Sequence, residues 1–287
     1  MNIRTLFDNK KPVFSLEIFP PKRSSSIDSI YSKLDSFMEV KPDYISVTFG
    51  AGGSENENLT CKLASDIKTK YGVEPLAHLT CIHSTRQQID AQLNALKNAG
   101  IENVLALRGD RVEGMEPTRD FAHASDLAAY IKDFGGFNIV GACYPEGHPE
   151  CSSRGQDTFN LRYKVDAGVT HLNSQLFFSN DDFYAFLERL RAAGINVPVE
   201  AGIMAVTNKN QIERMVSLCG ASLPAKFTRI MARYESNPAA LFDAGIAYAV
   251  NQIVDLIGSG VDGIHLYTMN NPEVALRIYS AVRNLLN

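Results

Sequence analysis

The chain has 287 residues, of which 45% are hydrophobic and 21% are charged, and its formal net charge is −4. This composition is that of an ordinary globular protein with a large core, and we expect one barrel-sized domain over residues 1–287. The 28 Lys and Arg residues form no runs, which argues against nucleic acid or an anionic membrane as a partner. Small-molecule substrates are therefore expected.

Targeting and redox signals are weak throughout the sequence. The first stretch, MNIRTLFDNKKP, is soon interrupted by charge and proline, and no run of about 18 apolar residues follows. We therefore expect a cytoplasmic protein. The five cysteines are odd in number and include no C-x-x-C pair, which argues against a disulfide framework. Reduced thiols are expected at Cys61, Cys81, Cys143, Cys151 and Cys219.

Short apolar segments alternate with helical patterns from one end of the chain to the other. This alternation is typical of βαβ units around a parallel sheet. The predicted strands are Val13–Phe19, Asp43–Phe49, Pro75–Cys81, Asn103–Leu107, Asn138–Tyr144, His171–Phe177, Val197–Ile203 and Gly263–Tyr267. Eight such units fit a closed (β/α)8 TIM barrel, a fold of roughly 250 residues.

The segments between the strands carry helix start signals and three long loops. Ser84–Gln87 and Ser179–Asp182 predict capping boxes, and Asn271-Pro272 predicts an N-cap followed by a first helical turn. Long loops after strands often cover or build a binding site. The three long segments are Gly109–His123, Pro145–Gln156 and Cys219–Pro238.

The side of the strands that faces the barrel interior is unusually polar. Successive strand residues point to opposite faces, so alternate positions can be assigned to the interior. The inward candidates are Ser15, Glu17, Ser46, Thr48, His78, Thr80, Arg108, Tyr144, Asn173, Gln175 and Glu200. Barrel interiors are normally filled by branched apolar side chains, and buried polar groups need partners. We interpret the set as a binding site, although any single Ser, Thr or Asn could simply satisfy its neighbours.

Glu17 is the strongest individual candidate in this set. It stands between Leu16 and Ile18, so an unpaired carboxylate there is expected to have a raised pKa. A carboxyl that holds a proton near neutral pH can act as a general acid. The alternative is a structural salt bridge, for example with Arg108.

Six segments near the strand ends follow one another in a fixed order: SLEIFPP (15–21), SVTFGAGG (46–53), HLTC (78–81), LALRGD (105–110), YPEGHPE (144–150) and NLRYKVDAG (160–168). In this order and spacing they resemble the methylenetetrahydrofolate reductases of the bacterial, catalytic-domain-only type. The resemblance implies a barrel that binds FAD and reduces 5,10-methylenetetrahydrofolate to 5-methyltetrahydrofolate. It also implies NAD(P)H or an electron-transfer partner protein as the electron source, a homo-oligomer, and a role in one-carbon metabolism and methionine biosynthesis.

The same resemblance implies roles for individual residues. Glu17 matches the acid that assists opening of the folate ring, and Asp110 matches a carboxylate beside the flavin that favours the cationic iminium. The residues expected to bind the cofactor are Thr48, Ala51, His78, Arg108, Gly109, Asp110, Ala124, Tyr144, His148, Asp157, Asn160 and Lys164. Those expected to contact the substrate are Glu17, Gln175, Gln211, Met215, Tyr267 and Asn271.

Three positions depart from the pattern of this family. Met215 replaces a phenylalanine that packs on the substrate, Asn271 replaces an arginine, and Phe49 replaces a common tyrosine. These departures leave the electron donor and the contacts to the folate tail open.

Two other functions are compatible with the same residues. One is a metal-dependent barrel hydrolase or lyase with Glu17, His78, Asp110, Glu146 and His148 as ligands. Because no cluster has the repeated spacing of a structural zinc site, we expect no metal. The other is a partner-dependent subunit of a larger reductase complex.

Overall fold

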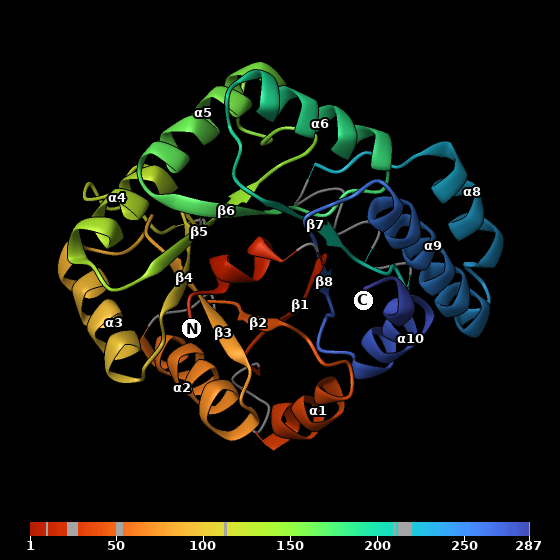
Figure 1. Ribbon diagram of the computed structural model, residues 1–287, viewed down its shortest axis with the longest axis horizontal. Coiled ribbons are helices and arrows are strands. Elements are labelled where there is room, and N and C mark those ends of the chain that lie inside the picture. The colour runs from red at the N-terminus through yellow and green to blue at the C-terminus, as the bar shows by residue number, and fades with distance from the viewer. Residues whose placement is uncertain are drawn as a thin grey trace.

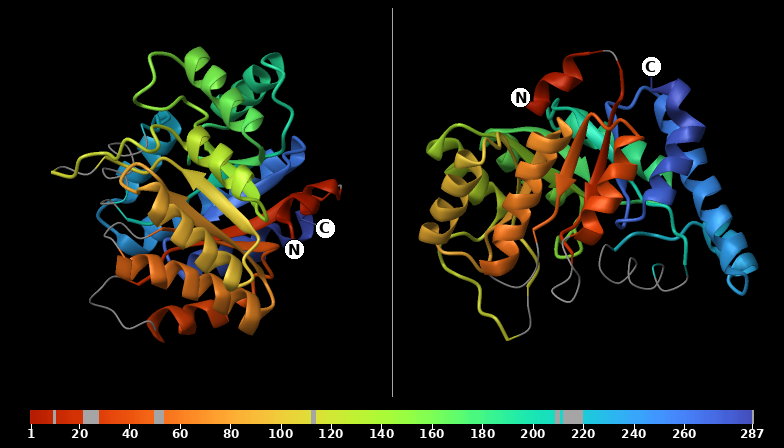
Figure 2. Two further views of the ribbon diagram at one scale, coloured as in Figure 1. Left: turned by 90° about the vertical axis from the view of Figure 1, so that its left-hand side faces the viewer. Right: turned by 90° about the horizontal axis from the view of Figure 1, so that it is seen from below.

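The computed structural model describes residues 1–9, 11–21, 28–49, 54–111, 114–208, 211 and 220–286. Eight parallel strands close into a barrel in chain order, and helices surround it (Figure 1). The predicted (β/α)8 TIM barrel is therefore confirmed. Figure 2 shows the N-terminal 3-10 helix at one end of the barrel and the long strand-to-helix loops at the opposite end.

All eight predicted strands are present. They are β1 (Val13–Ile18), β2 (Tyr44–Val47), β3 (Glu74–Thr80), β4 (Asn103–Leu107), β5 (Asn138–Cys143), β6 (Val169–Ser174), β7 (Val199–Ile203) and β8 (Gly263–Tyr267). The largest error concerns β6, which ends at Ser174 rather than at Phe177. The apolar run continues past the strand because Phe177 stacks on Phe183 of α6, with ring centroids 4.8 Å apart.

The helices that cover the barrel have clear caps at several starts. They are η1 (Ile3–Asp8), α1 (Asp28–Met38), α2 (Ser54–Tyr71), α3 (Arg86–Asn98), α4 (Ala124–Phe134), α5 (Arg154–Asp166), α6 (Asn180–Ala192), α8 (Ala225–Tyr234), α9 (Pro238–Gly258), α10 (Pro272–Val282) and η2 (Arg283–Leu285). The predicted capping box at α3 is wrong by one position, since Thr85 and Gln88 form it. Ser179 precedes α6 without a side-chain capping bond, so that predicted box is wrong too. The Asn271 cap of α10 is confirmed.

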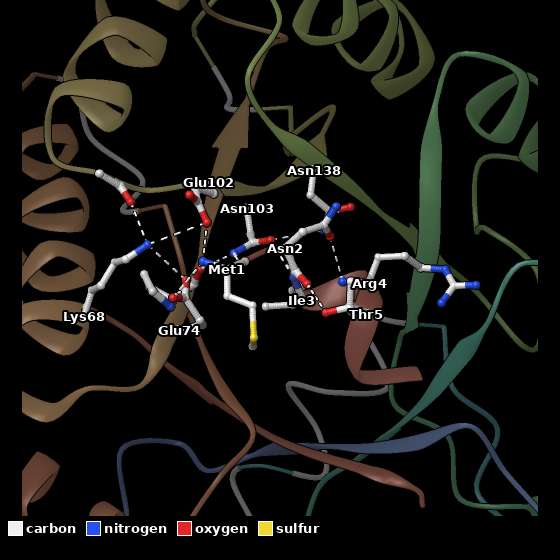
Figure 3. Close-up of polar contacts among 12 residues, drawn as sticks. Met1, Asn2, Ile3, Arg4, Thr5, Lys68, Glu74, Glu102, Asn103 and Asn138 are labelled. Carbon is white, nitrogen blue, oxygen red and sulfur yellow. Dashed lines mark hydrogen bonds and ion pairs between the residues drawn. The ribbon is translucent and has the colours of Figure 1, made fainter. Parts of the chain in front are cut away.

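Apolar and polar layers alternate along the barrel axis. At its N-terminal end, η1 closes the barrel, and its residue Ile3 forms an apolar layer with Val13, Tyr44, Leu76, Leu105 and Val140. Hydrogen bonds hold η1 against the strands at this end (Figure 3). Asn103 Oδ1 accepts from the Ile3 backbone N–H at 3.0 Å and from Asn138 Nδ2 at 3.2 Å. The polar interior therefore lies on the other side of this layer, toward the C-terminal ends of the strands.

The long helix α9 is apolar enough, by length and composition, to cross a membrane. In the structure it packs against β7 and lies between α8 and α10 (Figure 1). Its buried positions include Leu241, Ile246, Ile253 and Leu256. Packing on the barrel and on the neighbouring helices thus covers part of its apolar surface.

Gly245 permits the close contact between α9 and the segment after β7. A Cβ at this position would lie 2.0 Å from the Val206 carbonyl oxygen, so the backbone would have to move. We expect Gly245→Ala to lower the free energy of unfolding by about 1–3 kcal/mol or more. Gly258→Ala is the matched control in the same helix, because a Cβ there would meet nothing within 4 Å. Urea denaturation of both variants checks this prediction, and equal losses would contradict it.

Candidate active site

Glu17 lies near the C-terminal end of β1 and faces two histidines. Its Oε2 atom is 3.7 Å from His78 Nε2 and 3.6 Å from His265 Nε2. His78 lies on β3 and His265 on β8, on opposite sides of β1 in the barrel order. The Glu17 side chain retains 19% of its exposed surface, so a ligand at the barrel mouth can reach it.

His78 is held uncharged by its surroundings. Burial lowers the pKa of His78 to about 4, although the nearby Glu17 carboxylate acts in the opposite direction. Its Nε2 atom also lies 2.5 Å from the Ser46 hydroxyl oxygen. At neutral pH this imidazole is therefore a polar neighbour of Glu17 rather than its counter-ion.

Arg108 does not pair with Glu17, so the salt bridge suggested between these two residues is not formed. Its guanidinium forms two hydrogen bonds with the Glu150 carboxylate, at 2.7 and 2.6 Å. This pair lowers the pKa of Glu150 to about 2. It also joins the end of β4 to the loop between β5 and α5, where residues expected to bind the cofactor are found.

The predicted cofactor residues on strands and loops gather at the neighbouring ends of β3, β4 and β5. The Arg108 carbonyl accepts from the backbone of Cys81 at 3.1 Å, which joins the segments that follow β3 and β4. Gly109 has a φ of +87°, and a Cβ there would lie 3.1 Å from the Thr80 Cβ, so glycine permits this close approach. The rings of Tyr144 and His148 meet edge to face at 4.7 Å.

Helix α5 brings the second part of the cofactor set to the same sector. Lys164 Nζ donates to the Ala142 carbonyl of β5 at 2.7 Å. Asp157 is buried, which raises its pKa even though Lys164 opposes the shift. Asn160 Nδ2 lies 3.3 Å from Cys151 Sγ.

The remaining cofactor candidates lie around the mouth of the barrel. Thr48 follows β2 and accepts from the Thr60 hydroxyl at 3.0 Å through its carbonyl oxygen. Ala124 is the buried first residue of α4. Asp110 is exposed after β4, and its carbonyl oxygen lies 3.2 Å from His83 Nε2. Ala51 lies outside the described residues.

Besides Glu17, the predicted substrate residues Gln175 and Gln211 lie after β6 and β7, and Tyr267 is the last residue of β8. All three take part in local hydrogen bonds. Gln175 Oε1 accepts from the Leu176 backbone N–H, and Gln211 Oε1 accepts from that of Thr207, both at 2.8 Å. The Tyr267 hydroxyl donates to the Ser174 carbonyl at 2.8 Å. Met215 lies outside the described residues.

Asn271, the other predicted substrate residue, has a structural role in this chain. Its Oδ1 accepts from the Glu273 backbone N–H at 3.1 Å and caps α10. A contact with substrate would have to use the remaining amide group or follow a change of rotamer.

His265 is the principal residue that was missing from the predicted site. Period-two alternation in β8 places it on the inward face, but a buried histidine is more often a core residue than a site residue. Its position beside Glu17 depends on barrel closure, because β8 returns to pair with β1. The structure brings Ser15 and Glu200 to its other side as well.

The alternative metal site does not assemble. Glu146 accepts from the Ser222 backbone N–H at 3.0 and 3.1 Å, and His148 Nδ1 accepts from that of Glu150 at 3.1 Å. Over the part of the chain that the structure describes, no three His, Cys, Asp or Glu side chains are grouped to hold a metal ion. Glu146 and His148 thus stabilise the loop structure instead.

Comparison with known proteins shows the family to which this chain belongs. The sequence model of the family described as "Methylenetetrahydrofolate reductase" matches residues 2–283. The chain belongs to the methylenetetrahydrofolate reductase family. A relative named "5,10-methylenetetrahydrofolate reductase" from Pectobacterium carotovorum is 33% identical over 265 residues, which are 92% of this chain and 88% of the relative.

Plant members of the family are longer. "Methylenetetrahydrofolate reductase (NADH) 1" from Arabidopsis thaliana is 33% identical over 291 residues, and the match covers 96% of this chain but 49% of the relative. The chain thus spans about half the length of these relatives.

Solved structures agree on the fold. A protein from Clostridium thermocellum, described as binding two copies of 5-methyl-5,6,7,8-tetrahydrofolic acid, superimposes with a TM-score of 0.60 at 12% identity. The superposition covers 99% of both chains. Dihydropteroate synthase from Xanthomonas albilineans gives a TM-score of 0.52 at 14% identity, covering 95% of this chain and 93% of the synthase.

Proposed function

We propose that this member of the family reduces 5,10-methylenetetrahydrofolate to 5-methyltetrahydrofolate in a flavin-dependent reaction, with Glu17 as the general acid. The observation that carries the proposal is the position of Glu17. It lies at the barrel mouth between the cofactor sector at β3–β5 and the substrate sector at β6–β8, within 3.7 Å of one histidine from each side. An acid placed there can reach a substrate that spans both sectors.

The cofactor sector has side chains suited to FAD. Arg108, which Glu150 holds in place, and Lys164, whose pKa is lowered by burial, can contact a diphosphate, while Asn160 and Asp157 can hydrogen-bond to ribose hydroxyls. These four residues and His148 would hold the dinucleotide. When bound, the flavin supplies the hydride that ordinary side chains cannot provide.

Glu17 and Asp110 would then have different tasks in folate reduction. Glu17 donates its proton to the folate nitrogen that leaves the methylene carbon, so the C–N bond breaks and a cationic iminium remains on the substrate. Asp110, a carboxylate on the rim, favours that positive charge by electrostatic attraction. His78 is uncharged and so does not oppose the cation.

The electron source is proposed to be NAD(P)H, with a partner protein as the second candidate. The nicotinamide option is favoured because the name of the Arabidopsis thaliana relative includes NADH. Anaerobic mixing of the flavin-loaded protein with NADH and with NADPH distinguishes the donors. If neither bleaches the flavin but a reduced partner does, the second candidate is correct.

Flavin binding is the most direct check on the cofactor assignment. We expect the protein to bind FAD and to show a flavin absorption band. Lys164→Met should weaken FAD binding about 10–100-fold, the effect of losing one charged hydrogen bond. Lys226→Met, the same change on the exposed surface of α8, should leave binding unaltered. A wild-type protein that binds no FAD in a spectrophotometric titration would contradict the proposal.

A further inference from the structure

The centre of the barrel contains a second carboxyl group that the proposed reaction has not used. Glu200 of β7 has no exposed surface. Gly263, its neighbour on β8, makes room for it, because a Cβ there would lie 2.8 Å from Glu200 Cγ. Among the described residues, no lysine or arginine forms an ion pair with Glu200. Its polar partners are instead Ser15 and Tyr44.

A line of polar atoms leads from Glu200 toward Glu17, through two hydrogen bonds and one longer contact. The Ser15 hydroxyl donates to Glu200 Oε1 at 2.9 Å and also lies 2.7 Å from His265 Nδ1. The other nitrogen of the same ring, Nε2, is 3.6 Å from Glu17 Oε2. Hydroxyl and imidazole groups can each accept one proton while releasing another. The last gap exceeds a hydrogen bond, as is common in active sites before substrate binds.

We propose that Glu200, Ser15 and His265 form a proton relay that supplies Glu17 with the proton used in folate ring opening. The proposal rests on the general-acid role of Glu17 given above. Glu200 is a positioning and storage residue in this scheme, since it acts on the substrate only through Glu17.

The transfer balances without any electron change. The transfer starts from protonated Glu200, which donates to the Ser15 oxygen while the Ser15 hydroxyl has turned to donate to His265 Nδ1. His265 Nε2–H then passes its proton to the Glu17 carboxylate, Nδ1 takes the Ser15 proton, and Ser15 takes the proton of Glu200. One proton has moved from Glu200 to Glu17, and the imidazole has changed tautomer. After the product leaves, water at the mouth protonates Glu17, and the reverse sequence restores Glu200.

The surroundings of Glu200 suit a group that gains and loses a proton near neutral pH. Burial raises the pKa of Glu200 to about 7, while His265 and the hydrogen bonds from Tyr44 and Ser15 act in the opposite direction and Asp43 adds to the rise. Asn173 faces the same group from β6 through Tyr44, to whose hydroxyl it donates at 3.0 Å. The pKa of Tyr44 is raised by its own burial, so it remains a donor.

The relay has one open end. Below Glu200 the apolar layer that includes Leu76, Leu105 and Val140 separates it from the N-terminal end of the barrel. Glu17, in contrast, is partly exposed at the mouth. Glu200 is therefore a proton store that is filled and emptied through Glu17.

Glu200→Gln tests the relay, because the amide keeps the shape but cannot deliver a proton. Folate-dependent oxidation of the reduced, FAD-loaded protein is followed by stopped flow from pH 5.5 to 9. The oxidation rate of the wild type should show an inflection near pH 7. Glu200→Gln should lack this inflection, and its rate at neutral pH should be about 10-fold lower. Reduction of the flavin by nicotinamide should not change in either protein.

Tyr44→Phe distinguishes a relay from a merely structural role. It removes a hydrogen bond that favours the charged form of Glu200, so the inflection should move to higher pH. Ser15→Ala should abolish the inflection although Glu200 is still present. An unchanged pH profile in Glu200→Gln or in Ser15→Ala would overturn the relay.

A measurement without flavin or folate separates this proposal from the proposed function. In the full chain labelled with 15N-histidine, protonation of Glu200 near pH 7 should produce a step in the His265 ring signals, and this step should be absent in Glu200→Gln. If folate is reduced but this step is absent from the wild type, the relay is wrong and the proposed function stands. If the step is present but folate is not reduced, the proposed function fails.

Discussion

Glu17→Gln is expected to slow folate reduction by about 10²–10⁴-fold, the usual contribution of a general acid, while leaving reduction of the flavin by nicotinamide intact. The amide is nearly the same size as the carboxyl, so β1 should keep its register with Ser46 and Tyr267. It has no acidic proton to give to the folate nitrogen. The loss should therefore appear only in the step that opens the folate ring.

The two half-reactions are measured separately in the same preparation by anaerobic stopped flow. Glu188→Gln, on the exposed side of α6, is the control for replacing a glutamate elsewhere on the barrel. It should match the wild type in both steps. Equal losses in both half-reactions of Glu17→Gln would remove the acid role and point to a general disturbance of the site.

The barrel itself could be predicted from the sequence because its strands obey simple periodic rules. β4 and β8 begin and end where alternation and turn residues place them, and the other six differ by a few residues. The same period of two puts Glu17, His78 and Glu200 on the inward face, since each strand has only two faces. Local rules thus identified which side chains point into the barrel.

The partners of those side chains could not be predicted in the same way. Arg108 reaches Glu150 in a loop, and Glu17 meets His265 only because the last strand closes on the first. Neither contact has a sequence signature, because side-chain length and loop path decide it. The resemblance to the family identified Asn271 as a substrate position, yet its capping bond became visible only when α10 was placed.

Acidification below about pH 6.5 is expected to destabilise the barrel, and His171 should account for most of this effect. His171 has no exposed surface, and its ring lies 4.8 Å from that of Phe7 beneath the polar interior. Burial lowers its pKa to about 3. Between about pH 6.5 and pH 3, His171 therefore binds a proton in the unfolded chain but not in the folded chain. The free energy of unfolding should fall by about 1.4 kcal/mol for each pH unit in this window.

His171→Phe should remove this dependence while keeping a ring against Phe7. His78 and Glu200 are then the buried groups with the largest remaining pKa shifts, and their effects oppose each other. The lowered pKa of His78 makes stability fall as pH decreases below about 6.5, whereas the raised pKa of Glu200 makes stability fall as pH increases from about 4.5 to 7. Between about pH 4.5 and 6.5 the two slopes cancel.

Urea denaturation at several pH values between 5 and 6.5 checks this difference. The wild type should lose stability steadily on acidification, and His171→Phe should be nearly flat. His123→Asn, a change at an exposed histidine, should follow the wild type. If His171→Phe kept the slope of the wild type, then His171 would have to accept its proton inside the folded barrel. Water would then have to cross the apolar layer at the N-terminal end of the barrel. The same water would give Glu200 a second route for proton exchange, besides the one through Glu17.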